Sequence, residues 1–160
     1  MTKAEKENKA LELMREYWRV KQKLNDFGIC RTEGEPLGDY AEWLVASRLD
    51  LEFANNTVQS GYDLIDPTSG KTYQVKARRA FKDHSYKISI SKYDKYEFDY
   101  LIILIFNEDF SVMAAYQYTY DCIPLFFKSV PQRNSMELMF SIKNYKDKFE
   151  KVAGVKYLKI

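Results

Sequence analysis

Two neighbouring stretches of this sequence carry polar side chains at a spacing that suits chemistry. Asp63 follows Gly61, and eleven residues further on (74 − 63 = 11) comes the run Gln74-Val-Lys76. If both stretches are strands, Gln74 and Lys76 share one face, because side chains alternate along a strand. A hairpin between the strands would place Asp63 opposite them. A carboxylate, an amide oxygen and an ammonium group would then lie together.

The side chains available limit which metal such a group could hold. The chain contains one histidine, His84, and two cysteines, Cys30 and Cys122, on three distant segments. A zinc site of cysteine and histidine ligands is therefore not expected, and the cysteines are expected to be free thiols. Carboxylate and carbonyl oxygens remain as ligands, and they favour Mg²⁺, with Mn²⁺ as a substitute.

The hydrophobic pattern predicts the strands that must position these residues. Strands are predicted at residues 62–66 and 72–78, joined by the turn-forming run Asp66-Pro-Thr-Ser-Gly70. Tyr73, Val75 and Ala77 are expected to face the core. Residues 100–106 form a continuous apolar run, which is typical of a strand buried on both faces. Further strands are predicted at residues 51–54, 57–59, 87–91, 112–118, 136–142 and 155–159.

Helical periodicity is clearest near the N-terminus. Leu11, Met14 and Trp18 recur at spacings of three and four, and Leu24 follows six residues later, which predicts a helix over residues 3–26, with Gly28 as its stop signal. Further helices are predicted at 37–50, 121–129 and 144–152. The economical fold is one α/β domain over residues 1–160, with a central mixed β-sheet flanked by helices and an additional N-terminal helix.

The runs Gly61-Tyr-Asp63 and Tyr73-Gln-Val-Lys76 resemble the motif of the PD-(D/E)XK nuclease superfamily. In that motif an acid on one strand is followed by acid-x-lysine on the next, and a glutamate lies on the preceding helix. Glu42, in the run GDYAEWLVA, matches the helical position. The resemblance covers residues 31–118, closest to small prokaryotic and phage members, and implies a restriction-endonuclease-like fold. The N-terminal helix, residues 1–27, and the C-terminal extension, residues 119–160, lie outside it.

The resemblance implies metal-dependent hydrolysis of phosphodiester bonds in DNA. Asp63, Gln74 and the Val75 backbone carbonyl would hold Mg²⁺, and Glu42 would complete the shell or hold a second ion through water. Lys76 would orient the attacking water or counter the charge on the phosphate. The chain departs from the family at Gln74, where most members have a second carboxylate. A neutral amide oxygen holds a divalent cation more weakly, so this change favours low activity.

Charge is unevenly distributed, although the net charge is only +2. Residues 31–66 contain two basic and eight acidic residues, whereas residues 71–95 contain eight basic and two acidic residues. Carboxylates attract a divalent cation and basic residues attract a polyanion. The residues expected to contact DNA are Arg78, Arg79, Lys82, Lys87 and Lys92. Three tyrosines that interleave with lysines could stack on bases, namely Tyr86, Tyr93 and Tyr96.

Each candidate residue also has a purely structural explanation. Glu42 could be a surface residue at the edge of an apolar helix stripe, and Asp63 could belong to a turn. Lys76 and Arg78 could form the solvated face of an edge strand. The basic run as a whole could be ordinary surface charge.

Three functions remain open on this sequence. The first is a metal-dependent DNA endonuclease, used in restriction or phage defence. The second is a catalytically weak or inactive nucleic-acid-binding or assembly module on the same fold. The third is a protein-interaction factor that uses the aromatic run Pro124-Leu-Phe-Phe127.

Location and partners are expected from the same sequence features. The N-terminal residues are charged with both signs, and the longest apolar run is too short to span a bilayer. We therefore expect a cytoplasmic protein with DNA as its partner, no membrane association and no small-molecule cofactor beyond the divalent metal. A homodimer is the default expectation, because enzymes that cut both strands of a duplex commonly act as symmetric dimers.

Overall fold

A computed structural model describes residues 1–55, 61–80, 82–91 and 97–160 of the chain. By its internal contacts the chain divides into two compact units, Met1–Tyr40 and Ala41–Ile160. The predicted fold class is confirmed, since the structure is α/β with a mixed central sheet and helices that include the predicted N-terminal one. Across the described residues, none of the helices is both long enough and apolar enough to cross a membrane.

The first unit is built on helix α1, Lys3–Asp26, which has the predicted bounds. A capping box begins the helix, because Thr2 accepts a hydrogen bond from the Glu5 backbone and the Glu5 carboxylate accepts one from the Thr2 backbone. The helix ends at Asp26, and Gly28 two residues later has a φ of 71° and donates to the carbonyl of Asn25. Glycine adopts this left-handed conformation at little cost, so the predicted stop signal is confirmed.

The loop after α1 is held by buried polar groups. Lys21 is 5% exposed and donates to the Glu33 carbonyl over 2.5 Å. Asp39 accepts from the backbone of Arg31 at 3.0 Å and of Thr32 at 2.9 Å. These bonds satisfy polar groups that would otherwise be costly to bury. Asp39 lies in helix α2, Pro36–Leu49, which begins one residue before its predicted start.

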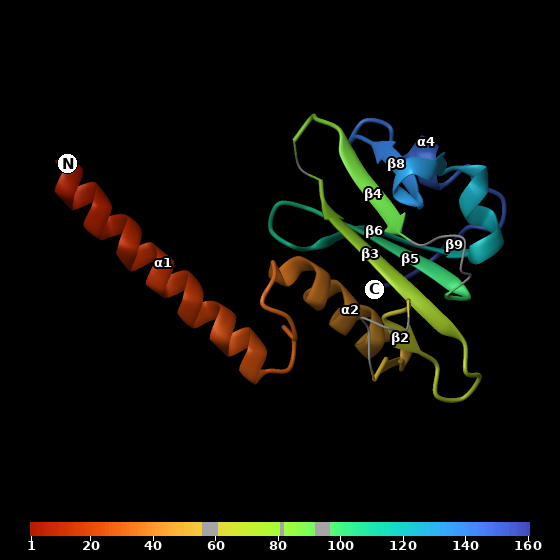
Figure 1. Cartoon of the computed structure of the whole chain (residues 1–160), viewed down its shortest axis with the longest axis horizontal. Helices are drawn as coiled ribbons and strands as arrows, with labels where there is room; N and C mark the ends of the chain where they lie inside the picture. The colour runs from red at the N-terminus through yellow and green to blue at the C-terminus, as the bar shows by residue number, and fades with distance from the viewer. Residues whose placement is uncertain (56–60, 81, 92–96) are drawn as a thin grey trace. The chain divides into compact units, whose positions relative to one another are not determined.

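A six-stranded mixed sheet organises the second unit, and Figure 1 shows β3 crossing its middle. The spatial order is β1 (Glu52–Phe53), β2 (Leu64–Ile65), β3 (Thr72–Arg79), β5 (Tyr100–Phe106), β6 (Val112–Thr119) and β9 (Lys156–Tyr157). β3 pairs antiparallel with β2 and parallel with β5 over seven residue pairs. β3 is therefore an interior strand.

Strand β5 is the most buried strand of the sheet, as its apolar run predicts. Residues 101–106 are all fully buried. Leu101, Ile103 and Ile105 belong to the main core cluster, whereas Ile102, Leu104 and Phe106 lie on the opposite face by strand alternation. Both faces of β5 are therefore covered, and β3 beside it is fixed in position.

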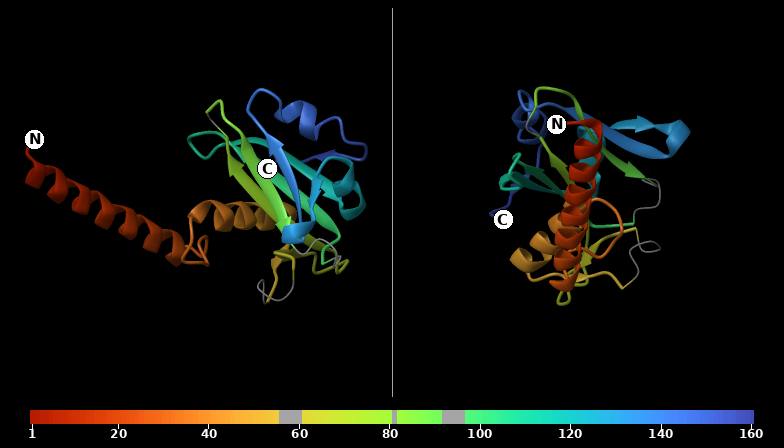
Figure 2. Two further views of the ribbon diagram at one scale, coloured as in Figure 1. Left: turned by 45° about the horizontal axis from the view of Figure 1, so that its top comes forward. Right: turned by 90° about the vertical axis from the view of Figure 1, so that its left-hand side faces the viewer.

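A second sheet of three strands was not predicted. It contains β4 (Tyr86–Ser91), β8 (Ser135–Phe140) and β7 (Lys128–Val130) in that order, all antiparallel. Ile88 and Leu138 of this sheet share the core cluster with Ile103 of the larger sheet, so the two sheets pack against each other. The strands β4 and β8 lie side by side in both Figure 1 and Figure 2.

The C-terminal third differs most from the prediction. Residues 121–129, predicted as one helix, form the 3₁₀ helix η2 (Tyr120–Leu125) and then β7, because Pro124 cannot donate the backbone bond that an α-helix needs. Another 3₁₀ turn, η3 (Pro131–Arg133), precedes β8. The predicted helix at 144–152 is reduced to α4 (Tyr145–Phe149), and the predicted strand at 155–159 to β9. The strand predicted at residues 57–59 lies outside the described residues.

Asp99 fastens the start of β3 to the start of β5. Its carboxylate accepts from the Thr72 backbone at 2.9 Å, from the Thr72 hydroxyl at 3.1 Å and from Lys71 Nζ at 2.7 Å. The Asp99 backbone donates in return to the Thr72 carbonyl over 3.0 Å. Burial raises the pKa of Asp99, but the hydrogen bonds from Lys71 and Thr72 outweigh it and hold the pKa below its usual range.

We predict that Asp99→Asn lowers the free energy of unfolding by about 1 to 2 kcal/mol near neutral pH, because an amide whose oxygen keeps the two Thr72 bonds turns its NH₂ group toward the Lys71 ammonium, which is itself a donor. A depressed folded-state pKa means that the carboxylate stabilises the fold above the ordinary Asp pKa and loses this effect as the pH falls. The difference between wild type and variant in urea unfolding should therefore shrink below about pH 4. Asp121→Asn, at an exposed carboxylate, is the control. An equal difference at every pH would contradict the prediction.

Candidate functional site

The β2–β3 hairpin places Asp63 beside the middle of the motif on β3. The Asp63 backbone donates to the Tyr73 carbonyl over 2.9 Å, and its carbonyl accepts from Ala54 at 3.0 Å. The turn between the strands closes through a 2.8 Å bond from Gly70 to the Asp66 carbonyl, while the Asp66 side chain caps the turn residues. The predicted turn chemistry therefore sets the register that brings Asp63 to Gln74.

The Asp63 carboxylate contacts two groups of the motif. Its Oδ2 atom accepts a 2.7 Å hydrogen bond from the Val75 backbone and a second bond from the Gln74 side-chain amide. The same amide nitrogen lies 3.5 Å from the Val75 carbonyl oxygen. The expected convergence of Asp63 and Gln74 is thus present, and the structure fixes the Asp63 side chain through the backbone of the neighbouring strand.

Lys76 shares its face of β3 with Gln74. In the parallel register Gln74 lies beside Leu101 and Lys76 beside Ile103, both of which face the second sheet. Val75 and Ala77, on the other face, are 5% and 7% exposed, in agreement with the prediction that they belong to the core. Because β3 is an interior strand, the alternative of a solvated edge strand is wrong.

Glu42 lies in the part of α2 that belongs to the second unit. It follows Ala41, which is fully buried, and is itself partly exposed. The helix runs on to Leu49 and leads into β1, the strand that pairs with β2. The rest of α2 and the strand β1 lie between Glu42 and the hairpin in the sequence, and the participation of Glu42 in the site stays a prediction.

Glu97 is a neighbour of the site that sequence reasoning missed. Gly61 has a φ of 70°, and a Cβ atom added to it would clash with the Glu97 side chain. The carboxylate side chain of Glu97 therefore packs directly on the backbone two residues before Asp63. The sequence signal was Gly61 itself, since a glycine ahead of a functional acid can mark a close approach.

The donor set at the hairpin fits a hard divalent cation. Asp63 offers a carboxylate, Val75 a peptide carbonyl and Gln74 an amide oxygen, and all three are oxygen ligands of the kind that Mg²⁺ and Mn²⁺ prefer. Within the described ranges, no group of three or more His, Cys, Asp and Glu side chains is arranged to hold a metal. A cation at this place would therefore depend on the amide and peptide oxygens beside Asp63.

Arg78 makes contacts inside the fold. Its Nε donates to the Lys87 carbonyl over 2.6 Å and its Nη1 to the Ala77 carbonyl over 2.8 Å. Burial lowers the pKa of the Arg78 guanidinium from its usual value. Because Lys87 lies on β4, the Arg78 side chain links the larger sheet to the smaller one.

The other residues expected to contact DNA have different surroundings. The Arg79 guanidinium lies 4.7 Å from the centre of the Phe110 ring, and its Nη1 donates to the Glu108 carbonyl over 3.3 Å. Lys87 Nζ lies 3.3 Å from the Glu137 carboxylate. The Lys82 side chain is exposed, whereas its backbone exchanges hydrogen bonds with the Tyr86 hydroxyl. Lys92 lies outside the described residues.

The prediction that three tyrosines stack on bases can be compared with the structure for one of them. Tyr86 is 9% exposed, and its ring lies 5.6 Å from that of Phe140 in the core cluster. The His84 ring lies 4.3 Å from it as well, so the prediction that Tyr86 stacks on a base is wrong, because both neighbouring positions are taken by rings of this chain. Tyr93 and Tyr96 lie outside the described residues.

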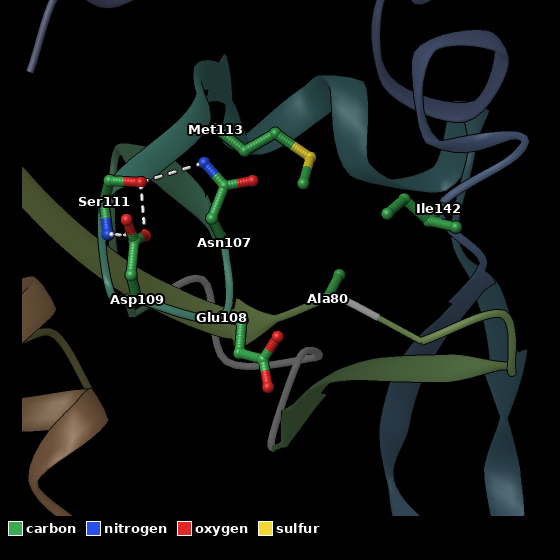
Figure 3. A pocket seen from close by; sticks show the side chains of 7 residues that line it. All are labelled: Ala80, Asn107, Glu108, Asp109, Ser111, Met113 and Ile142. Carbon is green, nitrogen blue, oxygen red and sulfur yellow. Dashed lines mark hydrogen bonds between the residues drawn. The ribbon is translucent and has the colours of Figure 1, made fainter.

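A separate hollow lies at the turn between β5 and β6, as Figure 3 shows. Its volume is about 410 Å³, and its lining residues are Ala80, Asn107, Glu108, Asp109, Ser111, Met113 and Ile142. Asn107 donates to the Ser111 hydroxyl, which donates to Asp109, so the polar groups are paired within the turn. Ala80 comes six residues after Gln74, directly after the end of β3. Six residues of extended chain span about 20 Å, so this hollow is separate from the hairpin site.

Comparisons with known proteins leave the family unassigned. No protein-family model matches the chain, and no curated protein is significantly similar to it in sequence. The geometry of the hairpin is therefore the basis of the functional argument.

We predict that Arg78→Ala lowers the free energy of unfolding by about 1 to 3 kcal/mol, because two partly buried carbonyls lose a charged donor. Arg78→Lys should restore only part of the loss, since lysine lacks the planar fork of donors. Urea unfolding of the purified variants measures both effects. Lys128→Ala, at an exposed side chain on β7, should change stability by less than about 0.5 kcal/mol. If Arg78→Ala unfolds like wild type, Arg78 does not stabilise the fold, and DNA contact remains as its proposed role.

Proposed function

We propose that the protein is a Mg²⁺-dependent endonuclease that hydrolyses phosphodiester bonds in DNA. The observation that supports this most directly is the contact of the Asp63 carboxylate with both Gln74 and the Val75 backbone, with Lys76 on the same face of the same strand. The Asp63 carboxylate, the carbonyl oxygens of Gln74 and Val75 and the Lys76 ammonium group all belong to one short hairpin. Cleavage used in restriction or phage defence would employ such a site.

The residues of the hairpin take distinct roles in this proposal. Asp63, the Gln74 amide oxygen and the Val75 carbonyl would hold the metal ion, and Glu42 would complete the shell through water. A bound Mg²⁺ polarises the phosphate and lowers the pKa of a water molecule. Lys76 orients the attacking water and counters the charge that develops on the phosphate. Because Asp63 is fixed by the Val75 backbone, little reorganisation is needed to present its carboxylate.

A second candidate function is a nucleic-acid-binding or assembly module on the same fold without catalysis. The observation that favours it is the Gln74 side chain, which donates to Asp63 and supplies no negative charge of its own. A site with one strand carboxylate holds a divalent cation more weakly than a site with two. DNA is the proposed partner under both functions, and the protein is proposed to act as a homodimer in the cytoplasm.

We predict that Asp63→Ala and Lys76→Ala each abolish cleavage of plasmid, linear duplex and single-stranded DNA in Mg²⁺ or Mn²⁺. The first removes the only carboxylate in the Asp63–Gln74–Val75 contact, and the second removes the positive partner on the same face. Reactions with a chelator give the metal requirement.

Control measurements separate catalysis from folding and binding. Both variants should keep DNA affinity and far-ultraviolet circular dichroism close to those of wild type, and Asp121→Asn should cut normally. Wild-type protein that binds DNA in every metal tested and never cuts it would favour the binding module instead.

The salt dependence of DNA binding tests the basic residues. Removing one phosphate-binding side chain should reduce the slope of log affinity against log salt by roughly 0.9. We therefore predict that Arg79→Ala with Lys82→Ala weakens binding across all sequences and flattens the slope, measured by fluorescence anisotropy. Lys128→Ala is the matched control. A slope unchanged in the double variant would assign both side chains to ordinary surface charge.

A further inference from the structure

The Gln74 amide lies between two oxygen atoms that the proposed function assigns to the metal. Its nitrogen donates to Asp63 Oδ2 and lies 3.5 Å from the Val75 carbonyl oxygen. Both oxygens carry full or partial negative charge, so the group between them must be positive or a donor. The amide NH₂ meets this need, whereas its own oxygen turned the same way would repel both partners.

We propose that Gln74 is a positioning residue whose amide takes the place of the cation, and that the amide must turn over when Asp63 and Val75 bind a divalent metal. In one orientation the amide nitrogen donates a hydrogen bond to Asp63 and stabilises the hairpin. In the other orientation the amide oxygen joins Asp63 as a ligand. This inference rests on the metal site of the proposed function and adds the step that controls metal affinity.

The chemistry of glutamine makes this turn accessible. The terminal torsion of the side chain is broad and roughly two-fold, so a half-turn exchanges nitrogen and oxygen without moving the strand. Glutamate at the same position could not serve in both states, because it has two acceptor oxygens and no donor at neutral pH. Gln74 is therefore suited to a hairpin that is stable without metal and that binds metal reversibly.

Replacing Gln74 should have opposite effects on stability and on metal binding. Gln74→Glu should place two carboxylates side by side, which destabilises the protein in a chelator. The same change should strengthen metal binding, because the ligand charge rises by one. Gln74→Leu should weaken both stability and metal binding, since leucine neither donates to Asp63 nor offers an oxygen to a metal.

Thermal unfolding of the full-length chain in a chelator and across Mg²⁺ and Mn²⁺ titrations tests this directly. We expect Gln74→Glu to melt below wild type in the chelator, and to reach half of its metal-induced rise in Tm at a concentration about tenfold lower. Gln74→Leu should also melt lower in the chelator and gain less from metal than wild type does. Gln117→Glu, at a partly buried glutamine on β6 of the same sheet, should match wild type in both conditions.

The side-chain amide of Gln74 provides a readout in the wild-type protein that does not depend on any variant folding. In wild-type protein labelled with ¹³C and ¹⁵N its NH₂ resonances, assigned by through-bond correlation to the Gln74 side-chain carbons, should move on addition of Mg²⁺. Resonances that stay in place while metal binds would overturn the inference, as would Gln74→Glu with the same Tm and the same metal midpoint as wild type.

Failure of this inference is distinguishable from failure of the proposed function. Wild-type protein that cuts DNA while Gln74→Glu shows wild-type melting and metal binding overturns the inference alone. The expected melting and resonance shifts, in protein that binds DNA without cutting it, support the inference and overturn the endonuclease. Wild-type protein that shows no metal-induced shift in Tm or resonance overturns both.

Discussion

The position of β3 between an antiparallel and a parallel neighbour is the constraint on which the rest of the second unit depends. Parallel pairing with β5 obliges the chain to leave the larger sheet after Arg79 and return at Tyr100, and β4 of the smaller sheet forms on this excursion. The core between the two sheets and the tie from Arg78 to Lys87 follow from that path. Asp99 fixes its return end.

The candidate site was predictable because its contacts are local. Asp63 and Gln74 are separated by one tight turn, whose residues identify it, and strand alternation then decides which side chains of β3 share a face. The same local rules predicted α1 and β5 with the bounds that the structure has. In each case the determining interactions lie within a few residues of one another.

Contacts between distant residues explain what the sequence did not show. The smaller sheet joins β4 to β8, whose paired residues Lys87 and Met139 lie far apart in the chain, and no local pattern indicates that pairing. The burial of Tyr86 and the role of Arg78 follow from this sheet, so both were interpreted as surface features. Glu97 was missed for a similar reason, because only the folded chain brings it onto Gly61.

The contact between Gln74 and Asp63 satisfies the Asp63 carboxylate without a metal ion, so the geometry of the hairpin does not distinguish an enzyme from a binding module. A carboxylate satisfied by a backbone N–H and an amide is a stable arrangement with or without catalysis, so the convergence of the motif residues is compatible with an enzyme and with a binding module. The two differ in the free energy needed to replace the amide donor by a cation. An enzyme requires that exchange to be favourable at cellular Mg²⁺ concentrations, whereas a binding module has no such requirement. The affinity of the Asp63–Gln74–Val75 site for Mg²⁺ therefore distinguishes the two functions better than the geometry of the site alone.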